Sequence, residues 1–110
     1  MQADLFQEVK PTQVRQKPQL QLGQKVWTRA VNDEIANNSF FAQFVIRSLA
    51  RHACGDWGNL SREDKALNNK ALERGDDRIL SAYEAEGLPK IWVITEWDRS
   101  VTTILFPSEY

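Results

Sequence analysis

The sequence predicts an α+β fold, with a three- to four-stranded antiparallel sheet packed by two or three helices. Two observations support this prediction. Two segments, one starting at Ser39 and one at Ser61, place apolar residues at helical spacing. Three later segments are rich in β-branched and aromatic residues and are separated by turn signals. Helices that precede a run of consecutive strands are typical of α+β domains.

The first part of the chain, residues 1–21, is expected to be a flexible arm. Glutamine recurs along it, and Pro11 and Pro18 interrupt regular structure. The alternative is that its apolar residues dock as an extended segment. These residues are Leu5, Phe6, Val9 and Val14. The remaining residues, 22–110, are few enough for one domain and many enough to bury a core.

A short strand is expected over residues 24–31, where side chains alternate after Gly23. Asn32 then caps a helical turn that runs to Ile35, because its side-chain oxygen can accept from free backbone N–H groups. The next helix begins at Ser39, and its broad apolar surface predicts the core helix. The apolar residues are Phe40, Phe41, Phe44, Val45, Ile46 and Leu49.

Glycines 55 and 58 bracket a tight turn that ends the core helix. A second helix opens at Ser61, where Asp64 stands in the place of the usual glutamate of a capping box. Its apolar stripe is thin, and Gly75 ends it. We therefore expect this helix to lie on the surface.

Three strands follow, over residues 78–84, 90–97 and 100–106. Residues 87–89 and the pair Asp98-Arg99 form the turns between them, so the strands make a meander that ends in a hairpin. Residues 100–106 are expected to leave a free strand edge. Because such an edge presents unpaired N–H and C=O groups, a homodimer through it is one expectation.

Composition excludes several functional classes. The single Cys54 cannot form an intramolecular disulfide, and the N-terminus carries no basic-then-apolar leader, so the cytoplasm is expected. No apolar run is long enough to cross a bilayer. The net charge of −1 argues against bulk electrostatic binding of nucleic acid. Residues 1–29 nevertheless hold five basic and two acidic residues, so a basic arm precedes an acidic body.

Metals and cofactors are not expected. One His and one Cys cannot make a four-ligand zinc site. Asp76-Asp77 after a helix end reads as a solvated pair rather than a site for a hard metal ion. The sequence also contains no glycine-rich phosphate loop of either familiar type.

One catalytic hypothesis is metal-free RNA cleavage, which needs a base, an acid and a cation that stabilises the phosphorane. Residues of the right types are His52, Glu96, Arg99, Thr102 and Thr103. Each also has an ordinary explanation. A histidine is favoured in the last turn of a helix, Asp98-Arg99 are normal turn residues, and threonines are common in strands. We therefore lean towards a protein that is not an enzyme.

Protein recognition is the other hypothesis. Trp, Tyr and Arg most often anchor protein interfaces, and this chain combines them with a net charge near zero. The candidate binding residues are Trp97, Asp98, Arg99, Arg51 and Asp56.

The order of residues from 51 to 110 resembles a family of short uncharacterised proteins. The residues that carry the resemblance include His52, residues 55–58, Asp64, Asn68, and residues 71–72, 78–83, 90–96, 98–105 and 107–110. Trp97 departs from it, since a small residue is expected there.

The family occurs on plasmids, integrated elements and phages. The resemblance implies a mobile-element accessory protein but assigns no activity. A protein-binding module, or an inhibitor of a host system such as defence, fits that context. The toxin-type ribonuclease is the alternative.

Overall fold

The computed structural model describes residues 18–110, and its elements confirm the α+β class. The helices are α2 (Arg29–Asn37), α3 (Ser39–Ala53) and α4 (Arg62–Arg74). The strands are β1 (Gln24–Trp27), β2 (Ile79–Tyr83), β3 (Ile91–Thr95) and β4 (Val101–Leu105), followed by a 3-10 turn, η1 (Pro107–Glu109). In the described part of the chain, no helix has the length and apolarity needed to cross a membrane.

The four strands form one sheet in the order β1-β4-β3-β2. The meander of β2, β3 and β4 is antiparallel, and its hairpin pairs Val93 with Ile104. The prediction that the whole sheet is antiparallel is wrong, because β1 runs parallel to β4. Parallel neighbours need a long crossover connection. Here three helices and two strands separate β1 from β4 along the chain, so β4 can run in the same direction as β1.

The free edge predicted for residues 100–106 is also wrong. Strand β4 has hydrogen-bonded neighbours on both sides, so the edges of the sheet are β1 and β2. Part of the β2 edge is covered by the loop before α4. Ala82 N–H donates to Trp57 O at 3.2 Å, and Asn59 N–H donates to Ala82 O at 2.7 Å.

Side-chain caps decide where the helices begin. The strand expected to reach residue 31 stops at Trp27, because Thr28 becomes the N-cap of α2 and its hydroxyl accepts from Val31 N–H. Asn32, the expected cap, therefore lies inside the helix. The predicted boundaries of α4 are confirmed: the Ser61 hydroxyl caps it, and it ends at Gly75 in the left-handed conformation.

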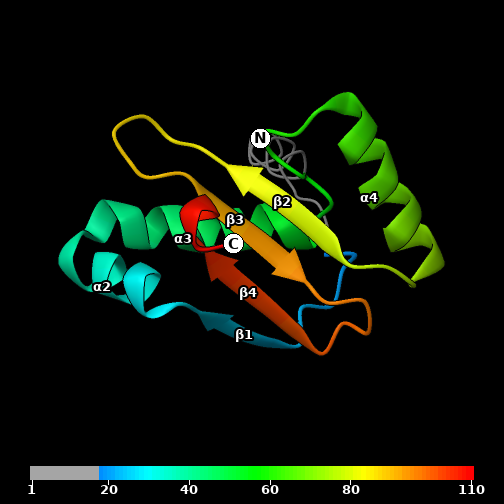
Figure 1. Ribbon diagram of the computed structural model, residues 1–110, viewed down its shortest axis with the longest axis horizontal. Coiled ribbons are helices and arrows are strands. Elements are labelled where there is room, and N and C mark those ends of the chain that lie inside the picture. Colours follow the sequence, from blue (N-terminus) through cyan, green and yellow to red (C-terminus); the bar gives the residue numbers. More distant parts are fainter. Residues whose placement is uncertain (1–17) are drawn as a thin grey trace, which may run out of the picture.

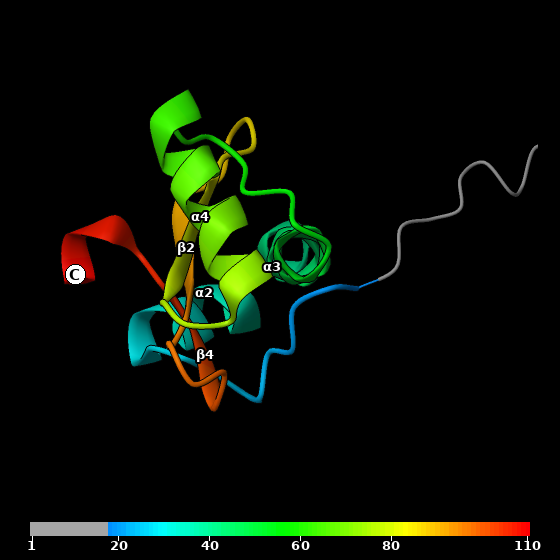
Figure 2. The same ribbon diagram turned by 90° about the vertical axis from the view of Figure 1, so that its right-hand side faces the viewer.

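Helix α3 packs behind the sheet, while η1 lies in front of it (Figure 1), and Figure 2 shows the two on opposite sides. The larger core cluster lies between the sheet and helices α2 and α3. Its buried residues are Val31, Phe41, Phe44, Val45, Tyr83, Ile91, Val93 and Ile104. On the opposite side, the Tyr110 ring meets the Trp92 ring edge-on, with centroids 5.4 Å apart.

A second core cluster sits beside α4 and contains Leu20, Trp57, Ala71 and Ile79. Leu20 belongs to the segment predicted as an arm, yet it is buried, and the N–H groups of Gln19 and Leu20 both donate to Ala53 O. The packed part of the chain therefore starts before residue 22. Residues 1–17 of the predicted arm lie outside the described residues, as do its apolar residues 5, 6, 9 and 14.

Candidate functional site

His52 lies in the last turn of α3 and is fully buried between the helix and the sheet. Both ring nitrogens are hydrogen-bonded. Nδ1 is 2.6 Å from the Ser81 hydroxyl on β2, and Nε2 is 2.9 Å from the Thr95 hydroxyl on β3. The chain of hydrogen bonds continues to the hydroxyl of Thr102 on β4, 2.7 Å from that of Thr95. It ends at Leu22 O, which Thr102 reaches at 2.7 Å. The chain thus crosses three strands.

The end of this chain sets the direction of every hydrogen bond in it. A carbonyl oxygen can only accept, so the Thr102 hydroxyl donates to Leu22 O. Its oxygen must then accept from Thr95, and Thr95 must accept from His52 Nε2–H. In a neutral ring, Nδ1 is left as the acceptor from Ser81. The arrangement therefore needs a proton on Nε2 of His52, which in the neutral ring is the Nε2–H tautomer.

Burial, together with the positive charge of Arg99, lowers the pKa of His52 to about 4. The Trp57 ring covers the imidazole edge-on, with centroids 5.7 Å apart. His52 is therefore neutral at physiological pH and sealed from solvent. A ribonuclease base must reach a substrate hydroxyl, and this histidine reaches only protein groups.

The other residues of the ribonuclease hypothesis do not gather around His52 as a cleft. Thr102 joins its hydrogen-bond chain and is buried, whereas Thr103, the next residue on the strand, points to the opposite face. Glu96 follows the end of β3, and its carbonyl accepts from Arg99. Of the predicted catalytic set, the described structure brings only His52 and Thr102 into one network.

Arg99 holds the β3–β4 turn against the end of α4. Its backbone is left-handed, with φ of 63°. Its guanidinium donates to four backbone carbonyls: Ala71 O at 2.9 Å, Asp77 O at 2.5 Å, Glu96 O at 3.2 Å and Trp97 O at 3.3 Å. Two of these acceptors lie outside the turn, so Arg99 joins the turn to α4 and to the start of β2.

Trp97 and Asp98 occupy the same turn with different roles. The Asp98 carboxylate accepts from the backbone N–H and the hydroxyl of Ser100, at 3.0 and 2.6 Å. These bonds hold the pKa of Asp98 below its usual range. Trp97 is 63% exposed. The turn therefore presents a large aromatic side chain to solvent on a backbone fixed by its two neighbours.

Arg51 and Asp56, the other predicted binding residues, bind each other. Arg51 Nε lies 2.6 Å from Asp56 Oδ2, and the guanidinium stacks on the Tyr83 ring, 4.8 Å from its centroid. The Tyr83 hydroxyl donates to Asp56 O at 2.7 Å. The hydrogen bond from Arg51 lowers the pKa of the Asp56 carboxyl. This pair braces the turn after α3.

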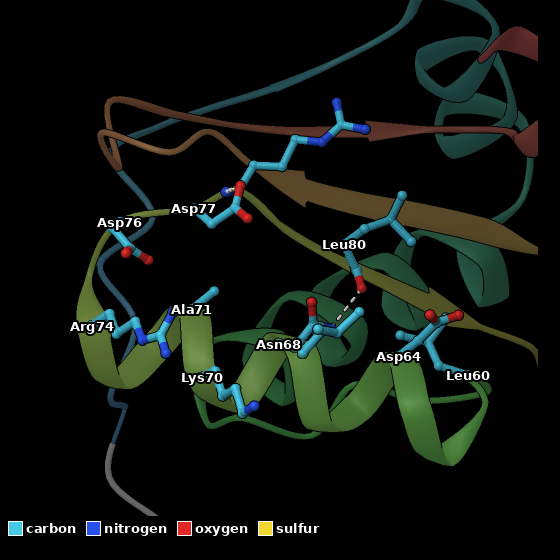
Figure 3. Close-up of a pocket in the computed structure, with 11 residues that line it drawn as sticks. Leu60, Asp64, Asn68, Lys70, Ala71, Arg74, Asp76, Asp77 and Leu80 are labelled. Atoms are coloured by element: carbon cyan, nitrogen blue, oxygen red, sulfur yellow. Dashed lines mark hydrogen bonds between the residues drawn. The ribbon is translucent and has the colours of Figure 1, made fainter.

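The structure also contains a groove that the sequence did not predict. We call it the α4–β2 groove, since its walls come from these two elements and the segment that joins them (Figure 3). Its volume is about 430 Å³. Asp76 and Asp77, read above as a solvated pair, lie on its rim. The facing walls of the groove come from two different elements, with Asn68 and Leu80 12 residues apart, so no local motif in the sequence marks it.

Within residues 18–110, no group of three or more His, Cys, Asp or Glu side chains could hold a metal ion. Comparison of the chain with protein-family models, with curated proteins and with solved structures found no match. The resemblance to mobile-element proteins therefore stays a prediction.

Proposed function

We propose that this protein is a non-enzymatic module that binds another protein, and that the β3–β4 turn with Trp97 is the centre of its binding surface. The observation that carries the proposal is the contrast between two side chains. His52, the one histidine of the chain, is sealed inside the fold, whereas Trp97 stands 63% exposed. Tryptophan is the residue type most enriched where protein interfaces gain their binding energy.

Rigidity of the turn supports the same proposal. Ordering a flexible loop costs binding free energy, and a loop held in place before binding avoids that cost. Arg99 already joins this turn to Ala71 and Asp77, and Asp98 caps Ser100. Trp97 is therefore presented by a backbone that has little conformational entropy left to lose.

The cellular setting is proposed from the resemblance alone. An accessory protein of a plasmid, integrated element or phage would act in the cytoplasm, and a compact binding module suits an inhibitor of a host defence or restriction system. The ribonuclease alternative has no supporting observation of its own, because its base is buried.

The test is capture of partners from a bacterial host lysate by the tagged full chain. Trp97→Ala removes the proposed anchor, and Trp27→Ala is the matched control, since Trp27 is also exposed (42%). An interface tryptophan contributes about 2 kcal/mol or more, which corresponds to roughly 30-fold in affinity. A partner retained by wild type and Trp27→Ala, and lost with Trp97→Ala, supports the proposal.

Equal recovery by all three proteins contradicts it. In a parallel assay, total RNA incubated with the purified chain should stay intact. Cleavage that disappears in a His52→Ala variant, folded as judged by circular dichroism, would overturn the binding proposal in favour of the nuclease.

A further inference from the structure

We infer that the α4–β2 groove receives one apolar side chain, together with a backbone N–H group, from an extended segment of the partner protein. This inference rests on the proposed function, because it specifies what a protein partner would place beside the Trp97 turn. It also assigns a role to Asn68, a residue for which no motif in the sequence indicates any chemistry.

The main evidence is the burial and the hydrogen bonding of the Asn68 side-chain amide. The residue is buried, with only 8% of its surface exposed. Nδ2 donates to Leu80 O at 2.8 Å. Its oxygen accepts no hydrogen bond from any residue between 18 and 110, and Figure 3 shows that oxygen directed into the space between α4 and β2. A buried amide oxygen that lacks a donor costs free energy until a ligand or water supplies one.

The groove that this oxygen faces also has an apolar lining. Leu60, Leu67, Ala71 and Leu80 line it. Leu67 is 63% exposed although it lies on the groove side of α4. A ligand that places an apolar side chain here and an N–H group at Asn68 would cover the apolar lining and donate to the Asn68 oxygen. Peptide segments combine these two groups at adjacent atoms.

Charge at the rim argues against other classes of macromolecule. Six charged residues line the groove, three acidic and three basic: Asp64, Asp76, Asp77, Lys70, Arg74 and Arg78. In the described part of the chain, none of the six forms an ion pair. Because the three acidic and three basic residues leave the rim with no net charge, it lacks the positive field that attracts a phosphate backbone. A protein segment, which can carry charges of both signs, matches this rim.

The position of the groove next to the β3–β4 turn supports one binding surface that includes both. The guanidinium of Arg99 bonds Ala71 O and Asp77 O, and both of these residues line the groove. The turn that presents Trp97 is thus fastened to one end of the groove.

The groove can be tested without knowing the partner. The probe is N-acetyl-leucine-N-methylamide, titrated into the ¹⁵N-labelled full chain while NMR follows the Asn68 side-chain amide and the backbone amides of Leu67 and Leu80. For a ligand of this size, the dissociation constant is expected to be about 1 mM. The control compound carries methyl groups on both nitrogens and donates no hydrogen bond. It should bind about fivefold more weakly, which corresponds to one neutral hydrogen bond.

Two variants complete the test. Leu67→Ala should weaken the probe about fivefold, and Ile46→Ala, an exposed residue of α3 outside the groove, should leave binding unchanged. Absence of shifts at the groove, equal binding of the methylated compound, or equal weakening by the two variants would overturn the inference. The proposed function fails separately, if partner capture does not depend on Trp97 while the probe still binds.

Discussion

His52 Nε2 lies 2.9 Å from the Thr95 hydroxyl, and this contact joins helix α3 to the centre of the sheet inside the core. Because Thr95 donates its own proton to Thr102, the imidazole must donate here. This hydrogen bond is therefore part of the folded core. It leads to two predictions about the protonation of His52.

The first prediction is the tautomer. ¹⁵N NMR of the histidine ring at pH 7 should find a protonated Nε2 and an unprotonated Nδ1, since Leu22 O fixes the direction of the chain. Thr102→Val removes the hydroxyl that donates to Leu22 O, so the direction of the hydrogen bonds is no longer fixed in this variant. A ring protonated at Nδ1 in the wild-type protein would contradict the assigned hydrogen-bond directions.

The second prediction is a loss of stability in mild acid. The pKa of His52 falls from 6.5 to about 4 on folding, so the unfolded chain binds the proton more tightly. The contribution of His52 to the free energy of unfolding should therefore be fully present above pH 6.5. It should decline as the pH falls towards 4, with a total loss of about 3 kcal/mol. Urea unfolding at pH 7.0 and pH 4.5 measures the decline.

A His52→Gln variant is the control for that measurement, because it cannot titrate in this window. Asp56 does not confuse the comparison, since the stability that its lowered pKa contributes is present above about pH 3.8 and is lost only at lower pH. If wild type and His52→Gln lose the same free energy between the two pH values, His52 is not a buried neutral base.

Arg99 supplies the third prediction. Lysine has one ammonium group and cannot reach four separate carbonyls in the fork geometry of a guanidinium. Arg99→Lys should lower the free energy of unfolding by about 1–3 kcal/mol. Arg47→Lys, on the exposed side of α3, should change it by less than about 0.5 kcal/mol. Similar values for both variants would mean that the turn is not held by Arg99.

Two glycines provide the fourth prediction. Gly58 and Gly75 both have positive φ, 73° and 70°. A Cβ at position 58 would lie 2.0 Å from Ala82 O, whereas a Cβ at 75 meets nothing within 4 Å. Gly75→Ala should therefore cost about 1 kcal/mol, the left-handed conformation alone. Gly58→Ala should cost at least about 3 kcal/mol by chemical denaturation, because the loop must also leave the β2 edge. Equal costs would show that this loop does not pack against β2 as described.

Local signals in the sequence predicted much of the fold. The hairpin, the boundaries of α4 and the core helix follow from alternation, from Ser61 and Gly75, and from helical spacing, all of which act over a few residues. The end of β1 was not predictable in this way, since the stretch around Thr28 alternates as a strand does and also contains a helix cap. The parallel pairing of β1 with β4 depends on residues far apart in the chain.

The candidate site was harder to predict for the same reason. His52 and Trp97 were singled out as residue types, but Ser81 and Thr95 lie 29 and 43 residues from His52, and no spacing rule connects them. Asn68 meets Leu80 across two different elements. Whether a polar side chain is buried and satisfied, or buried and lacking a partner, is decided by tertiary packing.

The measurement that tests the central proposal most directly is photo-cross-linking in host cells. The intact chain carries p-benzoylphenylalanine in place of Trp97 or, as a control, in place of Trp27. Position 97 should give a light-dependent adduct with one defined host protein, and position 27 should not. No adduct at position 97, the same adducts at both positions, or an adduct with RNA instead of protein would contradict a protein-binding module centred on the Trp97 turn.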